Sequence, residues 1–303
     1  MAERSALRRR LRRLAYPLEA LGALIVLGVF RLMPLDAASA AGGWVGRTLG
    51  PRLPMHRLAE RHLRRAIPEL DDDAVNRTLA EMWDNFGRIL GEYPHNAAIT
   101  RDAGRGGRIE IAGLEHVDAL RRSGAPCVLV SGHLANFEIF AKSCAAVGMD
   151  YAQIYRAPDN PLIDALLKRL RGLPPDRIMA KGASGARKAL SVLRQGGRIG
   201  ALVDQKMNDG IAVPFFGRDA MTATAPAQLA LRFDCPVVPV RMERLDGRCR
   251  FRMSFRSPLE TPRTGDRQKD VAIMTAAFTR LLEGWIRERP GQWLWPHRRW
   301  PDS

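Results

Sequence analysis

The chain of 303 residues is long enough for one large α/β domain or two small ones. Apolar residues make up 46%, which excludes a disordered chain, and the net charge of +16 predicts anionic partners such as nucleic acid, anionic lipid, phosphorylated substrate or an acidic protein. Four cysteines without a CxxC pair indicate reduced thiols, and they argue against a disulfide framework or a zinc site.

The N-terminus combines a basic stretch, RSALRRRLRR, with an apolar one. Residues 20–30 are all apolar or glycine, and extension to 14–33 approaches the roughly 20 residues that cross a bilayer. Glu19 and Arg31 lie near its ends, where long side chains reach the interface. We predict that residues 1–50 form a basic segment with a retained helical anchor, which either spans the membrane or lies in its interface. The alternative is a cleaved signal peptide, because AASAAGG follows.

The remainder, 51–303, is predicted to form a second domain. It begins with amphipathic helices over 55–67 and 71–93, and from about residue 107 strands alternate with helices. The predicted strands are 108–111, 127–131, 151–156, 177–179, 199–204, 237–243 and 250–255. The predicted helices between and after them are 114–122, 135–147, 161–171, 184–195, 225–233 and 269–289. This alternation favours an α/β fold with a central mixed, mainly parallel sheet flanked by helices.

The sequence SGHLANFEIF follows the apolar strand predicted over 127–131. Ligands of open α/β sheets bind beyond the carboxyl ends of the strands, so His133 is predicted to face such a crevice. Its side chain can fold back over the first helical turn, where Glu138 would accept a hydrogen bond from one imidazole nitrogen. The other nitrogen would then act as a general base toward a hydroxyl of the substrate. The alternative is a histidine that simply caps the helix.

Asp204 ends the apolar sequence IGALV and is predicted to face the same crevice, although a turn or cap aspartate has the same pattern. The motif is not HExxH, so no metal site is predicted. Ser131 lacks a GxSxG environment and is a weak candidate for a nucleophile.

Four motifs together resemble the late acyltransferases of lipid A biosynthesis, within the lysophospholipid acyltransferase group marked by HxxxxD/E. They occur in the family's order and cover about residues 107–300. They read SGHLANFEI, IYRAPDNPLIDALLKRLRG, ALVDQKMNDGIAVPFFGRDAMTATAPAQLALRFDCPVVPV and PGQWLWPHRRW.

The resemblance implies an acyl carrier protein thioester as donor and a hydroxyl of a Kdo-modified lipid A precursor as acceptor. It implies His133 as the base, Glu138 as its partner, and further catalytic roles for Arg171 and Asp204. It also implies contacts to substrate from Asn136, Asn160 and Gln205.

Other candidate substrate-binding residues follow from their chemistry. Arg156 and Lys181 could hold an anionic group of the substrate, although Lys181 could equally be an exposed loop residue. Phe215 and Phe216 could line an acyl tunnel or belong to the core. The tryptophans near the C-terminus could form an interfacial belt or pack against the last helix; they are Trp293, Trp295 and Trp300.

We therefore predict a membrane-associated O-acyltransferase on the cytoplasmic face of the inner membrane, without metal or bound cofactor. Its partners would be acyl carrier protein, the lipid A precursor and inner-membrane lipids, and no nucleic acid. The alternatives are an acyltransferase for another lipid, such as a lysophospholipid or a glycosylated phosphoinositide, and a non-catalytic anionic-lipid-binding protein. A nucleic-acid binder is the weakest alternative, since no such motif is present.

Overall fold

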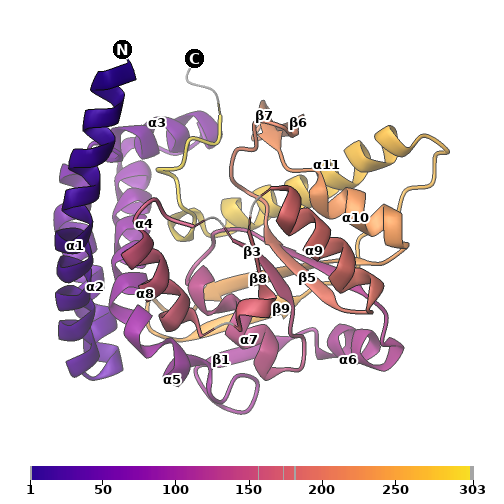
Figure 1. Ribbon diagram of the computed structural model, residues 1–303, viewed down its shortest axis with the longest axis horizontal. Helices are drawn as coiled ribbons and strands as arrows, with labels where there is room; N and C mark the ends of the chain where they lie inside the picture. Colours follow the sequence, from indigo (N-terminus) through magenta and orange to yellow (C-terminus); the bar gives the residue numbers. More distant parts are fainter. Residues whose placement is uncertain (1, 156, 173, 181, 301–303) are drawn as a thin grey trace.

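A computed structural model describes residues 2–155, 157–172, 174–180 and 182–300 (Figure 1). The α-helices are α1 (Ala2–Leu32), α2 (Leu35–Leu49), α3 (His56–Ala66), α4 (Asp72–Glu92), α5 (Asn96–Thr100), α6 (Leu114–Ser123), α7 (Phe140–Ala146), α8 (Pro161–Arg171), α9 (Ala183–Arg194), α10 (Ala225–Phe233) and α11 (Arg267–Glu288). The strands are β1 (Ile109–Ala112), β2 (Cys127–Ser131), β3 (Ala152–Tyr155), β4 (Ile178–Ala180), β5 (Arg198–Leu202), β6 (Ile211–Phe215), β7 (Arg218–Thr222), β8 (Val237–Arg244) and β9 (Phe251–Phe255). Short 3₁₀ helices lie at η1 (Gly50–Arg52), η2 (Tyr93–His95), η3 (Phe137–Ile139), η4 (Pro175–Arg177) and η5 (Pro290–Gln292).

Seven strands form the central sheet, in the order β1-β9-β8-β2-β5-β3-β4. The β8–β9 pair is antiparallel, and the other neighbours are parallel. Apolar side chains of β2 alternate between two cores: Val128 and Val130 pack with α9, α10 and α11, whereas Cys127 and Leu129 pack with α6 and α7. Because successive side chains of a strand point to opposite faces, the sheet is buried on both sides. The predicted mixed, mainly parallel α/β fold is confirmed.

The helix α1 contains an apolar stretch, Leu14–Leu32, that is long enough to cross a membrane by length and composition. Figure 1 shows α1 along one side of the molecule, beside α2 and α8. Large apolar side chains of α1 remain exposed, including Leu18 and Val29. The predicted N-terminal apolar helix is therefore present as a candidate anchor, and it leaves an apolar face on the outside of the fold.

Small residues allow α2 and α4 to pack at very short distance. A Cβ atom added at Gly42 would lie 2.3 Å from the carbonyl oxygen of Gly87, and one at Gly46 would lie 2.1 Å from that of Trp83. The same close approach is seen from α4, because a Cβ added at Gly91 would lie 2.2 Å from the carbonyl oxygen of Ala38 in α2. The helix α2 precedes the domain boundary predicted near residue 50, yet it packs directly against a helix that follows this boundary.

We expect Gly42→Ala to lower the free energy of unfolding by about 1–3 kcal/mol, because two backbones must separate to admit the methyl group. Chemical denaturation of the full chain in neutral detergent measures this change. Gly22→Ala in α1 is the matched control, since an added Cβ there meets nothing within 4 Å and alanine favours a helix. Equal stabilities of the two variants would contradict the close packing.

Two local features of the structure differ from what the sequence predicted. The helix predicted over 135–147 begins later, because Ala135 has a left-handed backbone (φ 48°) and a 3₁₀ turn precedes α7. A β6–β7 hairpin was not predicted; its two-residue loop, Phe216–Gly217, has positive φ at both positions. Such loops usually carry Asn-Gly or Asp-Gly, so the Phe-Gly sequence found here did not indicate a hairpin. The backbone N–H of Phe216 donates to Glu283 at 2.6 Å, which supports the strained residue.

Candidate active site

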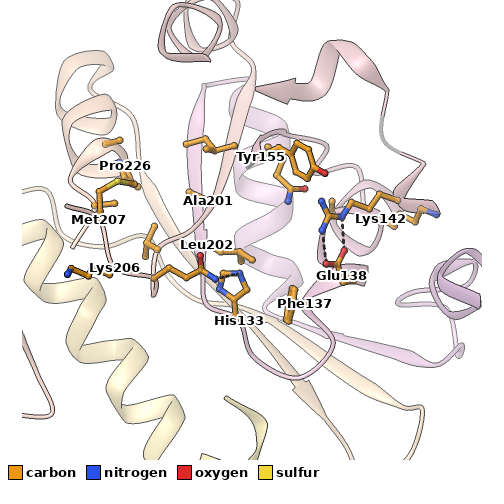
Figure 2. Close-up of a pocket in the computed structure, with 18 residues that line it drawn as sticks. His133, Phe137, Glu138, Lys142, Tyr155, Ala201, Leu202, Lys206, Met207 and Pro226 are labelled. Atoms are coloured by element: carbon orange, nitrogen blue, oxygen red, sulfur yellow. Dashed lines mark hydrogen bonds and ion pairs between the residues drawn. The ribbon is translucent and has the colours of Figure 1, made fainter. Parts of the chain in front are cut away.

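A cavity of about 380 Å³ opens beyond the carboxyl ends of β2, β3 and β5, where open α/β sheets bind their ligands (Figure 2). It contains four of the residues predicted from the sequence. The lining includes His133, Phe137, Glu138, Lys142, Tyr155, Arg171, Gln205, Lys206 and Met207. The remaining lining is mainly apolar and comes from α7, the ends of β3 and β5 and the start of α10.

His133 and Asp204 follow the neighbouring parallel strands β2 and β5, each two residues beyond a strand end, and the register of the strands brings them together. Nδ1 of His133 lies 2.7 Å from Oδ1 of Asp204, and the backbone N–H of His133 donates to Oδ2 at 2.7 Å. The carboxylate that holds this imidazole is thus that of Asp204. The predicted hydrogen bond between His133 and Glu138 is wrong, because other side chains occupy the Glu138 carboxylate.

Asp204 is buried and accepts a further hydrogen bond from Nε1 of Trp293 at 2.8 Å. Burial alone raises the pKa of a carboxyl, but the charge of His133 and the hydrogen bonds from His133 and Trp293 hold the pKa of Asp204 well below its usual value. Burial lowers the pKa of His133, and the attraction and hydrogen bond of Asp204 outweigh it, so this pKa lies above the ordinary imidazole value. The site therefore contains an imidazole oriented by an ionised carboxylate.

The second ring nitrogen of His133 lies in the cavity. Nε2 of the Gln205 amide is 3.2 Å from Nε2 of His133, and because an amide nitrogen only donates, the imidazole nitrogen accepts this bond. Nδ1 then carries the proton that is donated to Asp204. The ring of Phe137 packs edge-on, with centroids 4.7 Å apart. An unprotonated, oriented nitrogen in a cavity is the arrangement that general-base catalysis requires.

Glu138 is held by Arg171 rather than by the imidazole, and Figure 2 shows this ion pair apart from His133. Nε and Nη2 of Arg171 donate to the two carboxylate oxygens, each at 2.7 Å. Tyr93 at the end of α4 donates its O–H to Glu138 at 3.0 Å, and the guanidinium lies over the ring of Tyr155, 5.0 Å from its centroid. This bidentate pair fixes a cation at the cavity wall.

Residues that the sequence did not single out complete the site. Lys142 and Lys206 add two cations to the lining, and Nζ of Lys142 donates to the carbonyl of Leu170 at 3.3 Å. Burial lowers the pKa of Lys142. Lys142 and Tyr93 belong to none of the quoted motifs. Lys206 and Trp293 lie within them, but only the tertiary structure brings these two side chains to the site. With Arg171 the lysines make the cavity suitable for an anionic ligand.

The turn that carries His133 is fixed from behind the cavity. The N–H of Ala135 donates to the carbonyl of Gln292 at 2.9 Å, and the Ala135 carbonyl accepts from Nδ2 of Asn85 at 3.2 Å. Asn136 is fully buried and donates to Glu92 at 2.8 Å. Asn136 was predicted to bind substrate, but it lies outside the cavity lining. Its place in the structure is that of a residue that shapes the turn.

The sequence left two alternatives for Phe215 and Phe216, the lining of an acyl tunnel and the core, and the structure places both residues in the core. Phe215 stacks on Trp300 with centroids 5.5 Å apart, and Phe216 packs against Trp295 at 6.0 Å. Both phenylalanines and all three C-terminal tryptophans are buried, so the interfacial belt is wrong. The C-terminal segment packs on the β6–β7 hairpin, and this contact buries the phenylalanines against the tryptophans.

Asn160, another predicted binding residue, lies away from the cavity. Asn160 caps α8 through its side-chain oxygen, which accepts from the N–H groups of Leu162 and Ile163. Its Nδ2 donates to the carbonyl of Tyr16 at 3.1 Å and to Glu19 at 2.9 Å, so it attaches α1 to α8 away from the cavity. Arg156 and Lys181 lie outside the described residues. Within the described ranges, no group of three or more His, Cys, Asp and Glu side chains could hold a metal ion.

The fold and the site together are those of an α/β protein in which a carboxylate-oriented histidine lies at the strand ends beside a fixed arginine. The family model of the bacterial lipid A biosynthesis acyltransferases matches residues 6–302, so the chain belongs to that family and is an acyltransferase. The resemblance seen in the sequence motifs is thereby confirmed. A search of curated proteins finds no match.

Proposed function

We propose that this enzyme moves a fatty acyl chain from an acyl carrier protein thioester to a hydroxyl of a Kdo-modified lipid A precursor. Membership of the family supports a lipid A precursor as acceptor. The observation that carries the chemical proposal is the His133–Asp204 pair, with Nε2 of the imidazole turned into the cavity. Among the described residues, the lining of the cavity contains no Ser, Thr or Cys side chain, which suits a reaction in which the substrate supplies the attacking hydroxyl.

In the proposed mechanism, Nε2 of His133 removes the proton of the acceptor hydroxyl, which takes the place of the Gln205 amide. The alkoxide oxygen attacks the thioester carbonyl carbon, and a carbon–oxygen bond forms. Asp204 stabilises the imidazolium during this step. The carbon–sulfur bond then breaks, and the leaving thiolate receives the proton from Nε2. No residue of the enzyme is acylated, and no metal or bound cofactor takes part.

In this proposal the two carboxylates have separate roles, and Glu138 is no longer the partner of His133. Asp204 orients the base, and Glu138 positions Arg171. Within the described part of the chain, Nη1 of Arg171 has no protein partner, whereas Nε and Nη2 are held by Glu138. We propose that this nitrogen donates a hydrogen bond to the carbonyl oxygen as negative charge develops on it, or to a phosphate of the acceptor.

A second, larger cavity supplies a place for the acyl chain. It has a volume of about 920 Å³, lies between α9, α10 and α11, and shares Ile154, Met207 and Ala225 with the catalytic cavity. Much of its lining is aliphatic, including Leu190 and Leu229. We propose that the chain extends from the reacting carbonyl into this space, in place of the tunnel expected at the two phenylalanines. The apolar face of α1 supports association with a membrane. We propose that this membrane is the inner membrane and that the active site lies on its cytoplasmic side.

The proposal is tested with the purified full-length chain in neutral detergent, supplied with labelled acyl carrier protein thioester and a Kdo-modified lipid A precursor. Mass spectrometry should show a precursor heavier by one acyl group. Lysophospholipid and glycosylated phosphoinositide are offered in parallel. Transfer to one of these acceptors alone would overturn the proposed acceptor, and transfer from coenzyme A thioesters alone would overturn the proposed donor.

The raised pKa of His133 predicts the pH dependence of this reaction. A general base acts in its unprotonated form, so kcat/KM should fall as pH decreases through the pKa of the free enzyme. Since Asp204 raises this pKa, the acidic limb should lie above about 6.5, the ordinary imidazole value. A pH profile measured between mildly acidic and mildly alkaline buffers checks this. A limb below the ordinary value would contradict the ion pair.

A further inference from the structure

A second groove lies away from the catalytic cavity, between α3, the β7 strand and the C-terminal segment. Its volume is about 1040 Å³, and none of the residues that line it among those described also lines the catalytic cavity. We call it the α3 groove. Its cationic lining comes from three segments: Arg57, Arg61, Arg64, Arg65, Arg218 and Arg298.

Two arginines of the α3 groove lack an acidic partner among the residues that the structure describes. Glu60 is the one acid in the described lining, and it pairs with Arg64, which also meets Asp72. Arg57 and Arg61 lie one helical turn apart, are exposed, and have no protein partner within the described part of the chain. Cations gathered in one concave surface attract an anion that approaches from solution.

The floor of the groove contains a group that lacks a partner. The guanidinium of Arg218 stacks on the ring of Trp300, 5.3 Å from its centroid, and this holds it in one orientation. Its Nη1 atom is buried, and in the described part of the structure it has no hydrogen-bond partner. Buried polar groups without partners are rare in proteins. The stacked guanidinium of Arg218 therefore adds a fixed positive charge to the lining of the groove.

The apolar surroundings indicate what carries this anion. Met55 belongs to the lining and is 47% exposed, and Leu53 and Leu49 beside it are 42% and 53% exposed. On α2, Trp44 is also exposed. Figure 1 places α3 at the end of the molecule where α1 begins, and the arginines of the N-terminal sequence precede the apolar part of α1. A basic groove next to exposed apolar side chains fits a molecule with an anionic head and acyl chains.

We propose that the α3 groove binds the phosphate of an anionic lipid headgroup, as a site distinct from the catalytic cavity. Arg57 and Arg61 contact the phosphate, and Met55 and Leu53 face the chains. Together with α1, this contact sets how the enzyme sits on the bilayer. An acidic carrier protein would use the same charge but has no need of the exposed apolar side chains.

The test measures binding of short-chain phosphatidylglycerol, short-chain phosphatidylcholine and inorganic phosphate to the full-length protein in neutral detergent. We expect the Arg57→Gln/Arg61→Gln variant to bind phosphatidylglycerol roughly 25-fold more weakly, at about fivefold per arginine, with phosphatidylcholine binding unchanged. Arg105→Gln/Arg122→Gln removes two exposed arginines elsewhere and is the matched control. Added salt should weaken the phosphatidylglycerol binding of the wild type.

Several outcomes would overturn the proposal. They are full affinity in the α3 variant, an equal loss in the control, or inorganic phosphate binding as tightly as the lipid. A raised KM for acyl carrier protein with intact lipid binding would assign the groove to the carrier instead. Binding is measured without turnover and with His133→Ala in parallel, so a failure here is separable from a failure of the proposed acyl transfer.

Discussion

Asp204→Asn should lower kcat for acyl transfer by about 10³–10⁴-fold while the protein remains folded. The amide oxygen of asparagine would stay with the two N–H donors of His133 and Trp293, so the amide nitrogen would face Nδ1 of His133. An amide nitrogen cannot accept the Nδ1 proton, so the imidazole takes the other tautomer and its cavity nitrogen carries a proton. Such a nitrogen cannot act as a base. The measurement is kcat with the acyl carrier donor, and circular dichroism verifies the fold.

Glu138→Gln is the informative comparison, because Glu138 was predicted from the sequence to hold the imidazole. In the structure it holds Arg171 instead, so this variant should misplace the guanidinium and lose up to about 100-fold in kcat. Loss of the Asp204 charge should also move the acidic limb of the pH profile to lower pH, and the Glu138 variant should show a smaller shift. A larger loss in Glu138→Gln than in Asp204→Asn would restore the original assignment.

Arg244→Met should have the largest effect on stability, about 3–5 kcal/mol in the free energy of unfolding. Arg244 on β8 is 3% exposed and pairs with Glu92 on α4, which is fully buried. Nη2 donates to Glu92 at 2.9 Å, and Nε donates to Asn85 at 2.8 Å. Without the guanidinium, Glu92 would remain as a buried charge. Among the described residues, the side chains of Ser39 and Asn136 would still donate hydrogen bonds to it.

The matched control for this prediction is Arg252→Met on the neighbouring strand β9. Arg252 pairs with Glu110, but both side chains are nearly half exposed, and such surface pairs contribute about 0–1 kcal/mol. Denaturant unfolding of both variants in the same detergent gives the two values. If the two substitutions cost the same, the Glu92–Arg244 pair does not hold α4 to the sheet. The turn that carries His133 would then need another support.

Local patterns in the sequence predicted most of the fold. Each of the seven strands of the central sheet is found near its predicted position, because buried parallel strands are short apolar runs bounded by turns. The helix predicted over 135–147 begins late, since the hydrogen bonds that hold Ala135 in its left-handed conformation come from Asn85 and Gln292. Helix propensity is a local property of the sequence, so it does not reveal hydrogen bonds from a distant element.

The candidate site divides in the same way. The sequence alone determined that His133 and Asp204 each follow an apolar strand. It also placed Glu138 and Arg171 in two of the motifs that resemble the acyltransferase family. It did not determine which carboxylate meets the imidazole, because it does not reveal that β2 and β5 are neighbours. Only the tertiary structure decided this pairing, since hydrogen bonds between strands 71 residues apart set the register that places Asp204 beside His133.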